Sequence, residues 1–299
     1  MAAALALLGA VHGAVLLAGY LGPYDPAEQD RRHPYAPPGI AGCEPGPCTV
    51  RWFVRDASGR PRLFGVDAPA RLFALGSDEY GRDQFSRLLH GGRVSLAAGL
   101  LAAALSLGVG WAAGVAAGYR GGWLDAVLMR GAEFFLALPW LYLLFAVRAF
   151  LPLEVPPGQA LLLMAAIIGL AGWARPARLV RGVVLSARER GYVLAARGFG
   201  ASHLHILRRH VLPQTMGVAL THAALLAPQY VLAEVTLSFL GLGVGEPQPS
   251  WGNMLAALAH YHVLASYWWM ALPGVALAPV FLGYLSLAGA VLEAREPMS

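Results

Sequence analysis

The sequence predicts an all-α membrane protein with six transmembrane helices. The chain has 299 residues, of which 57% are hydrophobic and 13% charged, and its mean hydropathy is +0.55. Soluble domains carry about a quarter charged residues, so this chain lacks half of the usual solvating charge. A helical span takes about 20 residues. Six apolar stretches of suitable length cover residues 2–20, 94–118, 123–150, 159–175, 214–240 and 266–292.

The apolar stretches are predicted to be helices rather than barrel strands. A backbone in lipid must satisfy its own hydrogen bonds, which only helices and closed barrels achieve. Barrel strands alternate apolar and polar residues over about ten positions, whereas residues 100–105 are apolar throughout. The first stretch is predicted to be a retained helix rather than a signal peptide, because no Arg precedes it and no small-x-small cleavage site follows it.

The distribution of arginine predicts the orientation. Eight Arg lie between Arg175 and Arg209 against one acid, Glu189, and such an excess marks a cytoplasmic segment. A six-span count then places both termini in the cytoplasm, in agreement with Arg295. The predicted organisation is a first helix (1–21), an external loop with an interfacial helix (22–93), and a five-helix core (94–299) that contains a cytoplasmic loop (175–213).

All 22 residues in the Lys+Arg total are Arg, and the absence of Lys excludes several kinds of site. A phosphate-binding loop of the G-x-x-x-x-G-K-[ST] type, a Schiff-base centre and a Lys general base all require lysine. The net charge of +5 would indicate nucleic-acid binding in a soluble protein. Here the apolar composition favours a bilayer instead, and we expect no nucleic-acid partner.

The predicted external loop contains Cys43 and Cys48, which are separated by a Pro-Gly turn. An exported loop lies in an oxidising compartment, so a disulfide and two unpaired thiols are both open interpretations. Two Cys without nearby ligands predict no metal site. His203 and His205 predict none either, because residues two apart on a helix point about 200° away from each other.

The cytoplasmic loop is longer than a turn between spans requires. Its pattern predicts a short helix, a break at Gly200, a second short helix, and Pro213 at the entry to the next span. Apolar residues alternate there with Arg and His. Two interpretations are open from the pattern alone: a docking surface for a soluble partner, or a helix lying on anionic lipid.

This loop resembles the EAA motif of permeases from binding-protein-dependent ATP-binding cassette (ABC) importers. The motif has an Ala-Ala pair, a Gly four residues later and a closing Leu-Pro, which match Ala195, Ala196, Gly200, Leu212 and Pro213. Leu194 replaces the usual acidic first residue. Stretches at 76–89, 118–130 and 237–252 resemble the dipeptide/oligopeptide/nickel branch of the family, whereas residues 36–73 have no counterpart in its pattern.

The resemblance implies a type I importer permease with the MetI-like fold, in a prokaryotic inner membrane. Such a subunit forms half of the pathway for peptides or a related small solute. Its implied partners are a second homologous permease, two ABC ATPase subunits and an external solute-binding protein. The chain itself would bind no cofactor and catalyse no reaction, since ATP and Mg belong to the ATPases. Docking would use Ala195, Ala196, Gly200 and Ala201, with Leu212 and Pro213 coupling the loop to the fifth span.

Glu234 lies inside the predicted fifth span, one turn before Ser238. Burying a carboxylate there costs at least ~2–3 kcal/mol, so the residue needs an explanation. Two explanations carry equal weight. In the first, Glu234 and Ser238 line the pathway, or Glu234 pairs with an Arg of the partner permease. In the second, Glu234 makes a structural hydrogen bond between helices.

Two other classes of membrane protein are kept as alternatives. A secondary transporter usually contains repeated halves, and no repeat is found here. An intramembrane hydrolase would need a nucleophile and a base, but the chain has no G-x-S-x-G sequence and His222 has no evident Ser partner.

Overall fold

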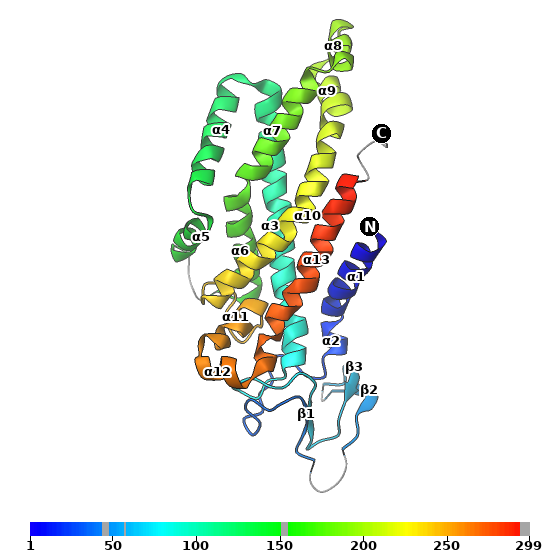
Figure 1. Cartoon of the computed structure of the whole chain (residues 1–299), viewed down its shortest axis with the longest axis vertical. Coiled ribbons are helices and arrows are strands. Elements are labelled where there is room, and N and C mark those ends of the chain that lie inside the picture. Colours follow the sequence, from blue (N-terminus) through cyan, green and yellow to red (C-terminus); the bar gives the residue numbers. More distant parts are fainter. Residues whose placement is uncertain (44–47, 57, 151–154, 294–299) are drawn as a thin grey trace.

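The computed structural model describes residues 1–43, 48–56, 58–150 and 155–293. The helices run mostly along one long axis (Figure 1). Four short strands lie at one end of this bundle, which we call the strand end. Helix α8 (Gly191–Gly198) lies at the opposite end, which we call the loop end (Figure 1).

The chain alternates long helices with short turns. The other α-helices are α1 (Ala2–Leu16), α2 (Ala18–Leu21), α3 (Gln84–Arg120), α4 (Gly122–Ala137), α5 (Trp140–Ala149), α6 (Pro157–Gly172), α7 (Ala174–Arg188), α9 (His203–Ile206), α10 (Leu212–Phe239), α11 (Trp251–Ala256), α12 (Tyr261–Ser266) and α13 (Leu272–Glu293). The strands are β1 (Gly39–Ala41), β2 (Arg51–Arg55), β3 (Pro61–Gly65) and β4 (Arg71–Phe73). Strand β1 pairs with β4 and β2 with β3, both antiparallel.

Among the described residues, three helical stretches are long and apolar enough to cross a membrane alone: Gln84–Arg120, His203–Phe239 and Trp268–Glu293. Two bent pairs raise the number to five, with α4 and α5 meeting at 95° and α6 and α7 at 46°. Helix α1 has 15 residues, fewer than the about 20 that a straight span takes. The six-span count and the side of each terminus therefore stay predictions, and Arg295 lies outside the described residues.

The segment before the predicted second span differs from expectation. The interfacial helix is not a separate element, because α3 runs without a break for 37 residues. Asp83 caps it, accepting a hydrogen bond from the Ser86 backbone N–H at 2.7 Å. The four strands of this segment were not predicted, since each has only three to five residues.

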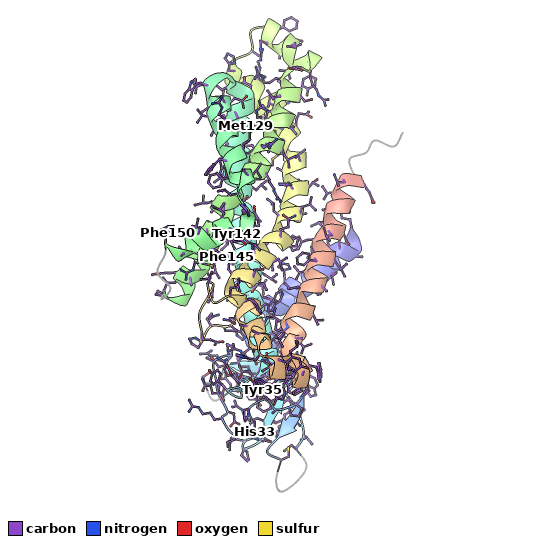
Figure 2. All side chains as sticks on the ribbon, turned by 60° about the vertical axis from the view of Figure 1, so that its left-hand side comes forward. His33, Tyr35, Met129, Tyr142, Phe145 and Phe150 are labelled. Carbon is purple, nitrogen blue, oxygen red and sulfur yellow. A yellow bond between two sulfur atoms is a disulfide. The ribbon has the colours of Figure 1, made fainter. Side chains whose placement is uncertain are left out.

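The predicted third span is also not one straight helix. It breaks at Leu138 and Pro139, between α4 and α5. Proline donates no backbone hydrogen bond and disfavours helical geometry in the preceding residue. Helix α5 consequently leaves the bundle sideways, with Tyr142 and Phe145 on it and Phe150 directly after its end (Figure 2).

The predicted fourth span ends near residue 175, but α7 continues to Arg188. Helix α7 packs against α3 along Gly110, Gly114 and Gly118. A Cβ at Gly110 would lie 2.6 Å from the Trp173 carbonyl oxygen, and one at Gly118 2.9 Å from Val184. Small residues allow two helix backbones to approach this closely. Half of the eight arginines in this region are thus carried on a packed helix: Arg175, Arg178, Arg181 and Arg188.

Candidate functional site

The segment with the EAA-like pattern forms the tip of the loop end, where α8 projects beyond the other helices and α9 follows it (Figure 1). Gly200 has φ +81°, a conformation that glycine adopts without steric cost. The Ala201 N–H donates to the Ala196 carbonyl and the Gly200 N–H to the Arg197 carbonyl, both at 3.0 Å. This is the Schellman arrangement that ends a helix, so the matched Ala and Gly residues shape the turn between α8 and α9.

The outer surface of this tip is mixed, with exposed apolar side chains among exposed Arg197, Arg208 and Arg209. Ala195 and Gly200 are exposed, whereas Ala196 and Ala201 are partly buried. Around them, large apolar side chains are exposed: Tyr192, Leu194, Phe199 and Leu204. Phe199 is 92% exposed. Sequence analysis did not single it out, although an aromatic residue next to a glycine break in a cationic loop is a usable signal. We call residues 191–211 the docking segment.

The inner face of the docking segment is packed into the bundle. Val193 and Ile206 are fully buried and share a cluster with Val184 and Val211. Leu212 packs against the same cluster. With Pro213 it forms the first turn of α10, where a missing N–H is tolerated. The docking segment is therefore joined to α7 and α10 through side-chain packing.

The end of α3 is hydrogen-bonded both to the end of α7 and to the docking segment. The Arg188 guanidinium donates to the Gly118 carbonyl at 2.7 Å, and the Tyr119 hydroxyl donates to the His203 carbonyl at 2.9 Å. Neighbouring helix α4 is tied to α7 by a two-pronged ion pair, in which Arg181 Nε lies 2.5 Å from Asp125 Oδ1. Sequence analysis missed these contacts because their partners lie 56 to 84 residues apart.

Glu234 and Ser238 lie together on α10, 0% and 2% exposed. The Ser238 hydroxyl donates to Glu234 Oε1 at 2.6 Å. Ser238 lines a cleft at the strand end, whereas Glu234 lines neither that cleft nor a second, mainly apolar cavity beside α10. The observed bond lies within α10, and Glu234 Oε2 has no hydrogen-bond partner among the described residues, so both interpretations of Glu234 stay predictions.

A cavity of about 380 Å³ lies where the two bent pairs meet α10. Its wall is mainly apolar, and the rings of Trp140 and Tyr230 stack there with centroids 5.9 Å apart. Polar groups reach it from Arg175, Gln229 and Thr236. Gln229 and Arg175 are exposed within this chain. No local sequence pattern predicts this cavity, since its lining comes from six helices.

At the strand end, the structure pairs Cys43 with Cys48 in a disulfide, with Cα atoms 5.6 Å apart. The intervening residues 44–47 lie outside the described residues. Within the described ranges, no group of three or more His, Cys, Asp or Glu side chains is placed to hold a metal ion.

Residues 106–293 match the family described as the binding-protein-dependent transport system inner membrane component. The dipeptide transport system permease protein DppC of Bacillus subtilis is 36% identical over 224 residues, covering 75% of this chain and 68% of that protein. The di/tripeptide transport system permease protein DppC of Pseudomonas aeruginosa is 34% identical over 284 residues, covering 94% and 82%. The oligopeptide transport system permease protein OppC of Bacillus subtilis is 33% identical over 233 residues, covering 77% and 73%.

A solved structure supports the fold. One chain of an amino acid ABC transporter superposes with a TM-score of 0.50 at 15% identity, covering 70% of this chain and 92% of that chain. At this identity the likeness concerns the fold alone. The family consists of non-catalytic inner-membrane subunits of ABC importers, which act with separate ATPase and substrate-binding partners. The chain belongs to the binding-protein-dependent transport system inner membrane component family.

Proposed function

We propose that this permease imports peptides and forms half of their translocation pathway, the other half being a second, homologous permease. The three named relatives are dipeptide, di/tripeptide and oligopeptide transport permeases. Two ATPase subunits would dock at the loop end, which would be cytoplasmic, and a solute-binding protein would deliver the peptide at the strand end. ATP and Mg would be held by the ATPases.

The docking segment is the observation that carries this proposal. Its outer surface exposes large apolar side chains together with arginines, while its inner face packs on α7 and α10 and is hydrogen-bonded to α3. An ATPase that grips the outer surface would move these helices as one body, which is how domain rotation is transmitted in alternating access.

Docking would use Ala195, Ala196, Gly200 and Ala201, together with Phe199. The first four shape a narrow, backbone-exposing turn, and the 92% exposed Phe199 ring would be buried by a partner's apolar pocket. Such buried aromatic anchors dominate many protein interfaces. Leu212 and Pro213 would couple this contact to α10.

The solute pathway would run along the residues that line the cavity beside α10, and Glu234 would not face it. Gln229 and Thr236 lie seven residues apart on α10, hence on one face of the helix, and both line that cavity. Polar groups within a membrane-spanning helix usually face a partner or a water-filled path. Trp140 and Tyr230 would give this wall an aromatic surface for the solute.

Reconstitution tests the proposed function. The permease is purified with its partner subunits, inserted into liposomes with ATP inside, and given the binding protein and radiolabelled Ala-Ala outside. We expect uptake that requires ATP and all partners. Uptake that persists without ATPases, driven by an ion gradient, would favour the secondary transporter, and release of cleaved product without uptake would favour the hydrolase.

A further inference from the structure

A polar cleft of about 380 Å³ opens at the strand end of the bundle. Its walls come from the start of α3, from the loop that joins α10 to α11, and from the turn that precedes α3. Two of its charged residues, Arg82 and Arg87, have side chains only 6% and 2% exposed. Both guanidinium groups nevertheless reach the same half-exposed carboxylate in the cleft.

That carboxylate belongs to Glu246, in the loop after α10. Arg82 Nη1 donates to Glu246 Oε2 at 2.5 Å, and Arg87 Nη2 donates to Glu246 Oε1 at 2.8 Å. The Glu246 side chain is 45% exposed. This carboxylate is thus bound by two buried arginines and is itself accessible to solvent.

The charges in this cluster balance only while Glu246 is present. Arg82 also donates to Asp78 Oδ2 at 2.6 Å, and Arg87 Nε lies 3.5 Å from the same oxygen. Asp78 is buried and bonded to its own turn. If Glu246 withdraws, two buried guanidinium groups share one carboxylate, and an uncompensated buried charge is strongly unfavourable. The vacated position therefore requires another carboxylate.

A second polar side chain in the cleft is only partly satisfied: the amide nitrogen of Gln84 donates to Met270 Sδ at 2.8 Å, but its amide oxygen has no partner among the described residues. Gln84 is 3% exposed and lines the cleft. A buried acceptor of this kind is normally satisfied. It lies beside the arginine pair, where the backbone N–H of a bound peptide would supply the missing donor.

We propose that Arg82 and Arg87 bind the C-terminal carboxylate of the transported peptide, and that Glu246 occupies this site when peptide is absent. Paired guanidinium groups match the geometry of a carboxylate. An entering peptide displaces Glu246, which frees the loop between α10 and α11. The inference rests on the proposed peptide import function, which it extends by naming the recognised group.

Hydrogen–deuterium exchange on the wild-type importer complex tests the displacement. The complex in nanodiscs, without binding protein, is given Ala-Ala or Ala-Ala-amide. We expect exchange of residues 240–250 to rise at least about twofold with Ala-Ala, because loss of the Glu246 tether opens local structure. The amide lacks the carboxylate and should leave exchange unchanged. An equal response to both peptides, or to neither, would overturn the inference.

A variant measures the competition directly. E246Q keeps the shape of the side chain but removes its charge, so binding of radiolabelled Ala-Ala should tighten about tenfold, while Ala-Ala-amide binding stays weak. Glu189 is exposed at the loop end and forms no ion pair among the described residues, so E189Q is the charge-matched control and should bind like wild type. Unchanged Ala-Ala binding by E246Q contradicts the inference.

Uptake in the same preparation separates the two proposals. ATP-dependent Ala-Ala uptake without discrimination between the carboxylate and the amide would contradict the carboxylate site alone. Failure of the complete wild-type importer to take up any peptide would contradict the proposed function. If E246Q cannot be purified, the exchange experiment on the wild-type complex decides the question.

Discussion

Asp83 is a buried carboxyl group whose protonation affects the stability of the strand end. Its side chain caps α3 and is 2% exposed, and its Oδ1 has no hydrogen-bond partner among the described residues. Burial raises the pKa of Asp83 to about 6. Its hydrogen bonds from the start of α3 oppose that shift without cancelling it.

We predict a pH-dependent difference between wild type and D83N. A carboxyl group whose pKa is higher in the folded state stabilises the fold fully below its unfolded pKa of about 4. This contribution is lost as the pH rises through about 6. Asn also caps helices but does not titrate. Between pH 4 and pH 8 the stability difference should therefore move by about 3 kcal/mol in favour of D83N.

Thermal unfolding midpoints of the two purified proteins across this pH range provide the measurement. A difference between wild type and D83N that stays constant with pH would show that Asp83 has an ordinary pKa.

Two substitutions of Gly200 distinguish the effect of backbone strain from the effect of added bulk on the docking surface. No atom lies within 4 Å of a Cβ built there, but its φ of +81° strains other residues. G200A and G200W carry the same backbone strain, costing about 1 kcal/mol, whereas only Trp adds bulk to the outer surface. We expect G200W to lose ATPase co-purification about tenfold or more and G200A to retain it. Membrane insertion should be normal for both, and normal co-purification of G200W would argue against docking at this turn.

At the scale of elements, the contact between α3 and α7 controls the position of the docking segment. Helix α7 leads directly into α8, and its close approach to α3 depends on Gly110, Gly114 and Gly118. The Tyr119 and Arg188 hydrogen bonds close the same region. A shift of α7 would therefore be transmitted to the ATPase contact.

We predict that G114L destabilises the protein strongly while G108L does not. A Cβ at Gly114 would meet backbone atoms of α7, which cannot move aside, whereas a Cβ at Gly108 meets nothing within 4 Å. Overpacking of this kind costs about 1–3 kcal/mol or more. Thermal unfolding and the yield of monodisperse protein would compare the variants. Equal stability of G114L and G108L would contradict the close packing of α3 and α7.

On the scale of the whole molecule, the two ends are proposed to bind different partners. The loop end presents a tip of exposed apolar and basic side chains on a packed base. The strand end holds short strands, a disulfide and the charged cleft. This asymmetry suits a subunit that meets ATPases at one end and a binding protein at the other.

Labelling of single cysteines tests the orientation. Cys43 in a C48S chain should react with a membrane-impermeant maleimide in intact spheroplasts. Arg190 is exposed at the loop end, and R190C in a cysteine-free chain should react only after permeabilisation. The reverse pattern would invert the predicted topology and both proposed docking assignments.

The sequence by itself determined the membrane class, the family and the place of the docking segment. These depend on local signals: apolar runs, a cluster of arginines, and the Ala-Ala, Gly and Leu-Pro spacing, whose Gly200 adopts the left-handed turn that its neighbours' hydrogen bonds require. Hydropathy could not reveal that α7 extends the predicted fourth span, because the arginines of α7 lower the mean hydropathy of this stretch. Its other face nevertheless packs on α3.

Only the tertiary structure decided the residues of the cleft and the burial of Glu234. Arg82 and Glu246 lie 164 residues apart, and no periodic pattern connects them. Glu234 in the sequence is a charge in a span, and packing alone shows that its partner is Ser238 on its own helix. The physical reason is general: an apolar run is recognised one segment at a time, whereas paired charges and close glycine contacts exist only once distant segments have packed together.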